Sequence, residues 1–148
     1  MIRPATVHDA PAIAIVNRIS SSTAMPWLPV LHSLDGDTKF FTRVVVEQTF
    51  AVAEVDGAVA GFCGVHEGWL EQLYIHPDHQ GQGLGSAFIA WAKDGARHLQ
   101  LWVFEQNHAA RAFYAGHGFV EAERTDGSRN VEKTPDVRMT WARQAADV

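Results

Sequence analysis

The chain has 148 residues, of which 47% are hydrophobic and 20% charged, and its formal net charge is −5. This profile is typical of one folded domain, spanning residues 1–148, and excludes a disordered or fibrous chain. The acidic balance of charges argues against a nucleic-acid partner, and a single cysteine excludes a disulfide framework. The lack of a long apolar segment or an apolar leader predicts a cytoplasmic protein with no membrane partner.

Apolar residues recur at helical spacing in some segments and alternate in others. Ile13, Val16 and Ile19, each three apart, are typical of one helix face. In the first half of the chain, the predicted elements are an edge strand at residues 2–5, a helix from a capping box at 6–9 to about 20, an irregular stretch at 20–35, a helix capped by Asp37, and a hairpin of strands 50–55 and 58–65 around Asp56-Gly57.

The second half continues as alternating strands and helices. The predicted elements are a strand at 69–75, a helix at 87–96, a strand at 98–104, a helix from an Asn107 cap to about 115, and strands at 119–123 and 137–141. Strict alternation along 69–75 predicts that Glu71 and Leu73 share one face, with Leu70 and Tyr74 on the other. The order of elements predicts a mixed α/β domain.

A glycine-rich turn, with glycines at 81, 83 and 85, lies between a predicted strand and a predicted helix. Unpaired N–H groups at a helix N-terminus bind anions, and glycine lets a phosphate approach the backbone. The spacing does not fit a dinucleotide fingerprint, which needs glycine where Ser86 stands, or a Walker loop, which needs Gly-Lys-Ser/Thr. Two interpretations stay open from spacing alone: a phosphate site, or a tight turn that packs helix against strand.

Two motifs resemble the signatures of the GNAT superfamily of N-acetyltransferases. The first is an apolar strand that ends at a proline-containing turn and continues as Gln80-Gly81-Gln82-Gly83-Leu84-Gly85, similar to the family pattern Gln/Arg-x-x-Gly-x-Gly/Ala. The second is Asn107, followed seven residues later by Tyr114 and then by a Gly-Phe strand start. The resemblance covers nearly the whole chain and is weakest before Thr49 and at residues 126–135.

This resemblance implies a GNAT-like fold, with a central, mostly antiparallel twisted sheet of about six or seven strands flanked by about four helices. It also implies acetyl-CoA as cosubstrate, with the turn's backbone amides on the pyrophosphate. The strand before the turn is implied to splay at a bulge and to pair with the pantetheine arm. Carried over to this chain, the coenzyme-binding positions are Leu73, Tyr74, Ile75, Gln80, Gly81, Gln82, Gly83, Leu84, Gly85, Ser86 and Asn107. For Asn107, a role as helix N-cap is an equally good interpretation.

Tyr114 is the expected catalytic side chain. When an amine attacks a thioester, the departing thiolate benefits from a proton donor, and the matching position of the family supplies a tyrosine hydroxyl. The alternative is a half-buried core tyrosine with a hydrogen-bonded hydroxyl. For the base that deprotonates the amine we favour Glu71, followed by Glu105 and then His66; in some relatives a water molecule takes this role.

Neither a metal site nor a covalent intermediate is expected. His76 and His79 lie close in sequence, but no second cluster completes a tetrahedral set. Cys63 lies in an apolar strand and is expected to be buried and unreactive. The leading hypothesis is therefore acetyl transfer to a primary amine by direct attack. A non-catalytic acyl-CoA sensor and an acetyltransferase of protein N-termini or lysines are the alternatives, and a homodimer is compatible with the resemblance.

Overall fold

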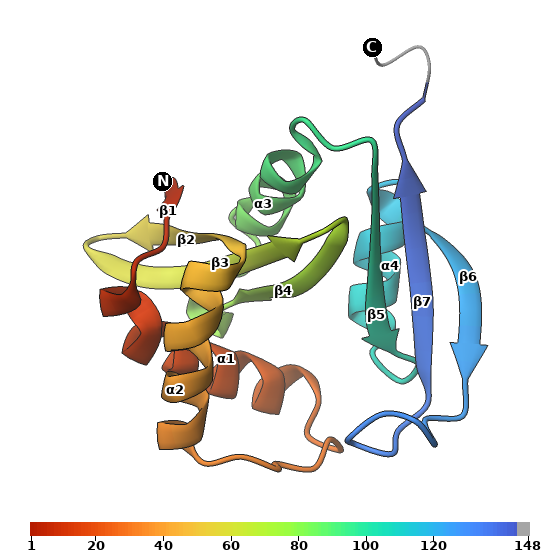
Figure 1. The fold of residues 1–148 in the computed structure, drawn as a ribbon, viewed down its shortest axis with the longest axis horizontal. Coiled ribbons are helices and arrows are strands. Elements are labelled where there is room, and N and C mark those ends of the chain that lie inside the picture. The colour runs from red at the N-terminus through yellow and green to blue at the C-terminus, as the bar shows by residue number, and fades with distance from the viewer. Residues whose placement is uncertain (145–148) are drawn as a thin grey trace.

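The computed structural model describes residues 1–144 and contains a seven-stranded sheet with four α-helices (Figure 1). The elements, in chain order, are β1 (Ile2–Pro4), α1 (Ala10–Ala24), α2 (Leu34–Glu47), β2 (Thr49–Val55), β3 (Ala58–His66), β4 (Trp69–Ile75), α3 (Leu84–Lys93), β5 (His98–Phe104), α4 (His108–Gly116), β6 (Val120–Thr125) and β7 (Asp136–Ala142). Short 3-10 turns, Val7–Asp9 and Pro77–His79, precede α1 and α3. The predicted mixed α/β fold and its order of elements are confirmed.

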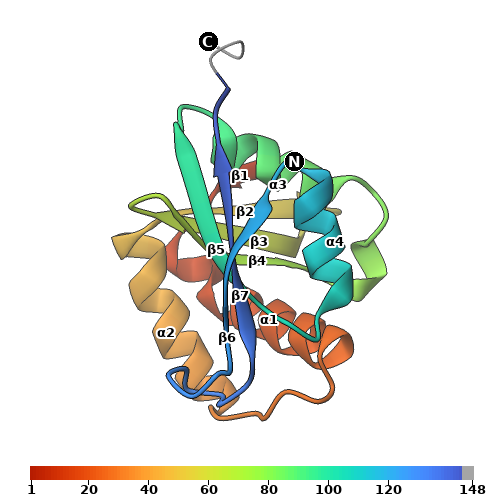
Figure 2. The ribbon, with the colours of Figure 1, turned by 90° about the vertical axis from the view of Figure 1, so that its right-hand side faces the viewer.

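The sheet has the strand order β1-β2-β3-β4-β5-β7-β6, and only the β4–β5 pair is parallel. Helices cover both faces, so neighbouring residues of β2 pack into different cores. Phe50 and Val52 join the core under α1 and α2, whereas Ala51 and Ala53 join the core under α3 and α4. Figure 2 shows these two helix pairs on either side of the central strands.

Two irregularities open the middle of the sheet. The register of β3 and β4 shifts so that Gly64 pairs with Gln72 and Val65 with Leu70, which leaves Glu71 as a bulged, unpaired residue. β4 and β5 then pair only at Trp69 and Gln100 before the strands diverge. Figure 1 shows β5 running steeply away from β4. The predicted bulge is confirmed.

This bulge makes the predicted face of Leu70 wrong. Leu70 packs in the same core as Leu73 and Ile75, and Tyr74 packs in the other core. Strict alternation would put Leu70 with Tyr74, but the extra residue at Glu71 shifts the alternation by one place. Sequence periodicity alone does not reveal a bulge, because its position depends on pairing with β3.

Helix boundaries differ from the predicted ones in three places. Ser33, and not Asp37, caps α2, because its Oγ accepts the Gly36 N–H at 3.0 Å. α1 continues to Ala24, so the irregular stretch begins later than predicted. α3 begins at Leu84, directly after the glycine turn, and ends at Lys93.

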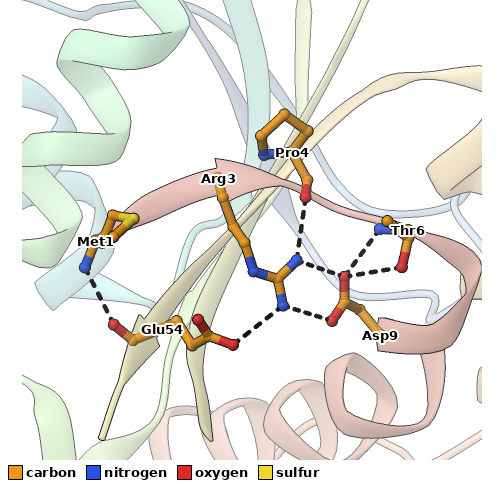
Figure 3. A network of polar contacts seen from close by, with 6 residues as sticks. All are labelled: Met1, Arg3, Pro4, Thr6, Asp9 and Glu54. Atoms are coloured by element: carbon orange, nitrogen blue, oxygen red, sulfur yellow. Dashed lines mark hydrogen bonds and ion pairs between the residues drawn. The ribbon is translucent and has the colours of Figure 1, made fainter. Parts of the chain in front are cut away.

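An ion-pair network ties the N-terminal strand to the sheet (Figure 3). The Arg3 guanidinium donates to both oxygens of Asp9 at 2.9 Å and to Glu54 Oε1 at 3.3 Å, while the Thr6 N–H donates to Asp9 Oδ2 at 2.8 Å. Hydrogen bonds from Arg3 are the main reason that the pKa of the Asp9 carboxyl lies below its ordinary value. The depressed pKa means that ionised Asp9 stabilises the folded state.

We expect Asp9→Asn to lower the free energy of unfolding at pH 7 by about 2 kcal/mol, as for other hydrogen bonds to charged groups. The folded pKa of Asp9 is lower than the unfolded one, so this stabilisation is present above about pH 4 and is lost as the pH falls through the folded pKa. Urea unfolding of both proteins between pH 7 and pH 3 measures the difference. Asp35→Asn is the control, since that carboxylate is 83% exposed and, within residues 1–144, forms an ion pair only with Lys39. Equal losses in both variants would contradict the expectation.

Candidate functional site

A cavity of about 490 Å³ lies where β4 and β5 diverge. Its walls come from the end of α1, from β4 and β5, from the glycine-rich turn and from α4. The cavity brings together Glu71, Leu73, Tyr74, Ile75, Gln80, Gly81, Gly83, Leu84, Gly85, Ser86, Asn107 and Tyr114. Of the predicted site residues, only Gln82 does not line it.

The glycine-rich turn forms an anion cradle at one end of the cavity. Within residues 1–144, the consecutive backbone N–H groups from Gly81 to Ser86 have no hydrogen-bond acceptor. Gly81 and Gly83 have φ values of +77° and +84°, which favour glycine, and a Cβ on either would meet only open space. The N-terminus of α3 adds its partial positive charge. A pyrophosphate therefore fits here without any basic side chain.

The open edge of β4 offers backbone groups along the cavity. The His76 N–H donates to the Ala60 carbonyl of β3 at 2.7 Å, and successive residues of a strand direct their N–H and C=O groups to opposite edges. Leu73 and Ile75 therefore direct theirs toward the diverging β5. The Ile75 carbonyl accepts from Ser20 Oγ at 3.0 Å and from Gln80 Nε2 at 3.2 Å. An extended amide chain can pair with the remaining groups as a strand would.

Asn107 caps α4, as predicted from its position. Its Oδ1 accepts the Ala110 N–H at 3.2 Å, while the residue also lines the cavity. The side-chain amide still has N–H groups for a ligand, since no hydrogen bond from them is found within residues 1–144. The two interpretations of Asn107 are thus compatible in this geometry.

Tyr114 lies on α4 with its ring packed edge-on against Phe113 and Phe119, at centroid distances of 5.3 and 5.7 Å. The side chain is 8% exposed, and its hydroxyl has no hydrogen-bond partner within residues 1–144. Burial, with smaller contributions from Cys63 and Tyr74, raises the pKa of the hydroxyl above its ordinary value. The group therefore keeps its proton at neutral pH and can donate it into the cavity.

Of the three candidate bases, only Glu71 lines the cavity. The bulge exposes Glu71, and its carboxylate makes no ion pair within residues 1–144. Glu105 instead pairs with Arg124 at 2.9 Å. His66 lies at the outer end of β3, beside Glu67. The structure thus favours Glu71 by position.

The sequence did not indicate several of the residues that line the cavity. Ser20 is almost fully buried and reaches β4 from α1, and His79 has a buried Nδ1 with no partner within residues 1–144. Phe104 also lines the cavity. In the sequence, only the position of Ser20 near the end of an apolar helix face pointed to these residues. The contacts that form the cavity join distant parts of the chain.

The described part of the chain offers no grouping of three or more His, Cys, Asp or Glu side chains suited to a metal ion. None of its helices combines the length and apolarity required to cross a bilayer. Cys63 is fully buried, and burial raises the pKa of its thiol, so the thiolate is disfavoured.

Comparison with known proteins assigns the family. A family model described as acetyltransferase (GNAT) domain matches residues 46–121. The L-amino acid N-acyltransferase MnaT of Escherichia coli is 32% identical over 137 residues, covering 80% of this chain and 78% of that protein. The peptidyl-lysine N-acetyltransferase YiaC of the same organism is 28% identical over 80% of this chain and 82% of its own length. An uncharacterised N-acetyltransferase of Methanocaldococcus jannaschii is 33% identical, but the match spans 55% of this chain and only 43% of that protein.

A solved structure supports the same fold. The PaiA N-acetyltransferase of Thermoplasma acidophilum, in complex with coenzyme A, superimposes with a TM-score of 0.79 at 21% identity, covering 97% of this chain and 98% of that one. The seven-stranded sheet with its split between β4 and β5, the glycine turn before α3 and the family match all agree. This chain is therefore an acetyltransferase and belongs to the GNAT family.

Proposed function

We propose that this enzyme transfers the acetyl group of acetyl-CoA to a primary amine by direct attack in a ternary complex. The observation that carries the proposal is one cavity that is lined both by the glycine turn, whose N–H groups from Gly81 to Ser86 have no acceptor within residues 1–144, and by Tyr114. The coenzyme A complex of the structural neighbour and the amine acceptors named for two relatives support this choice.

In this reaction, the amine nitrogen attacks the thioester carbonyl carbon, so a C–N bond forms and the C–S bond breaks. Glu71, directly or through a water molecule, accepts the proton that the nitrogen loses. Tyr114 donates a proton to the departing thiolate sulfur. The backbone of Leu73 and of the glycine turn holds the coenzyme, so the reacting carbon stays oriented toward the acceptor.

Calorimetric titration of acetyl-CoA into the wild-type protein, followed by a thiol-release assay with an amine panel, tests the proposal. We expect one binding site per chain and release of free thiol that depends on the amine. A folded wild-type protein that binds no acetyl-CoA would overturn the proposal, because the cradle would then serve another anion.

Glu71→Gln is expected to lower kcat by about 100-fold with an alkylamine acceptor, because the ammonium form must lose its proton before attack. Raising the pH should recover part of the lost rate, since more of the amine is then already neutral. Glu67→Gln is the matched control: Glu67 is 81% exposed on the β3–β4 turn and does not line the cavity. A pH–rate profile of Glu71→Gln that coincides with that of the control would remove Glu71 from the mechanism.

A further inference from the structure

Two further cavities meet the coenzyme cavity at Phe104. The second, of about 450 Å³, lies between the end of β5 and the β6–β7 loop. The third, of about 200 Å³, lies against the segment between α1 and α2. Phe104 lines all three cavities, and Tyr74 lines the first and the third. Each outer cavity therefore shares a wall with the coenzyme cavity at Phe104.

Glu132, on the β6–β7 loop, lines both outer cavities. Within residues 1–144, its half-buried carboxylate makes no hydrogen bond or ion pair. Its negative charge adds to the effect of burial in raising the pKa of the Tyr74 hydroxyl to about 12. Glu132 therefore lies near the boundary between the coenzyme cavity and the outer cavities.

The other charged groups of these cavities form ion pairs, accept hydrogen bonds or are exposed to water. Glu123 pairs with Arg138 and Asp37 with Arg18, each at 3.0 Å. The Asp136 carboxylate accepts hydrogen bonds from the Thr125 hydroxyl and from Asn130 Nδ2. His32 and Arg129 are exposed, and the charge of Arg129 contributes to lowering the pKa of Asp126. Within the described residues, Glu132 is thus a partly buried carboxylate of the outer cavities that has neither an ion pair nor a hydrogen bond.

The loop that carries Glu132 is fixed by its own hydrogen bonds. Asn130 Nδ2 donates to the Thr134 carbonyl at 2.6 Å and to Asp136 Oδ2 at 3.2 Å, and the Thr134 N–H donates back to Asn130 Oδ1 at 3.1 Å. A Cβ on Gly127 would lie 2.3 Å from the Thr134 backbone, so the loop is closely packed there. These contacts hold Glu132 in place before any ligand binds, which lowers the ordering cost of binding.

Part of the wall of the third cavity is apolar, and the rest is polar. Leu28, Pro29, Val30 and Leu31 line the third cavity. The Trp27 ring packs edge-on against Phe104, with the ring centroids 6.0 Å apart. Such walls suit a methylene chain, and a carboxylate at their end suits a cation.

We propose that Glu132 selects the acceptor of this enzyme by binding the distal ammonium group of an aliphatic diamine, whose other amine reaches the thioester. The inference rests on the proposed function, since it identifies the acceptor class of the same site. A neutral distal group would leave Glu132 without a partner, and an anionic one would be repelled by it. Selectivity among acceptors therefore follows the charge of the distal group.

Three acceptors of equal chain length test this inference: 1,4-diaminobutane, butylamine and 4-aminobutanoate, with the six-carbon series in parallel. We expect wild-type kcat/KM to be at least about 10-fold higher for the diamine than for the monoamine, and lowest for the amino acid. Glu132→Gln should bring the diamine and the monoamine to similar values. Glu132→Lys should move the preference to the amino acid.

Glu47→Gln is the matched control, because it removes the same charge from an exposed site on α2 outside the three cavities. Acetyl-CoA titration into the wild-type protein and each variant distinguishes a failure of the diamine inference from a failure of the proposed function. If the wild-type protein binds acetyl-CoA but does not prefer the diamine, or if Glu132→Gln keeps that preference, the diamine inference is overturned and the coenzyme proposal stands. If the folded wild-type protein binds no acetyl-CoA, the proposed function itself is overturned.

Discussion

Tyr114→Phe is expected to lower kcat by about 100-fold or more, the usual cost of losing a general acid, with acetyl-CoA affinity close to that of the wild type. Tyr114 lines the cavity, and its hydroxyl has no hydrogen-bond partner within residues 1–144. Burial raises its pKa, so the group stays protonated over the neutral range and serves as a donor. The thiolate that leaves in the variant must instead take its proton from water.

The chain offers a matched control, since its second tyrosine, Tyr74, lines the same cavity. Tyr74→Phe also removes one hydroxyl and keeps the ring, yet we expect its kcat to stay near that of the wild type. Calorimetry and thiol release, measured on both variants, separate binding from turnover. A large loss in Tyr74→Phe together with wild-type turnover in Tyr114→Phe would assign the proton donor to Tyr74.

Gly83→Glu is expected to abolish acetyl-CoA binding without unfolding the protein. The new carboxylate would stand among the N–H groups that are proposed to hold the pyrophosphate, and like charges repel there. Gly83 has a φ of +84°, so the substitution also costs about 1 kcal/mol of backbone strain.

Gly95→Glu controls for that strain and for the added charge. Gly95 has a φ of +77°, a Cβ there would also meet open space, and the residue lies outside the coenzyme cavity. We expect both variants to lose similar stability in urea unfolding, whereas calorimetry should show coenzyme binding only in Gly95→Glu. Retained binding in Gly83→Glu would move the pyrophosphate away from the turn.

The sequence predicted the coenzyme-binding end of the site well because that end is local. A strand, a glycine turn and a helix lie within about twenty-five residues, Trp69 to Lys93, and their mutual placement depends on short-range geometry. The caps at Thr6 and Asn107 are equally local, and both were predicted. Asp37 was a wrong choice for a cap because Ser33, four residues earlier, also suits that position and starts the helix first.

The face of Leu70 was predicted wrongly for a different reason. Period-two alternation holds only while two strands stay in register, and the shift against β3 at Gly64 and Val65 adds one residue to β4. The same pairing decides whether Glu71 reaches the cavity. Its position is therefore a property of two strands together, which the sequence of β4 alone does not contain.

The sequence by itself determined the order of strands and helices, the position of the glycine turn, and the family, because each depends on neighbouring residues or on recurring motifs. The tertiary structure alone decided the gap between β4 and β5, the bond from Ser20 to Ile75 across 55 positions, and the meeting of three cavities at Phe104. It also decided that Glu132, which has no ion pair within residues 1–144, lines the same cavity as Tyr74. Contacts between distant segments form only when the whole sheet closes, so the acceptor side of this enzyme emerges from packing and the coenzyme side from local sequence.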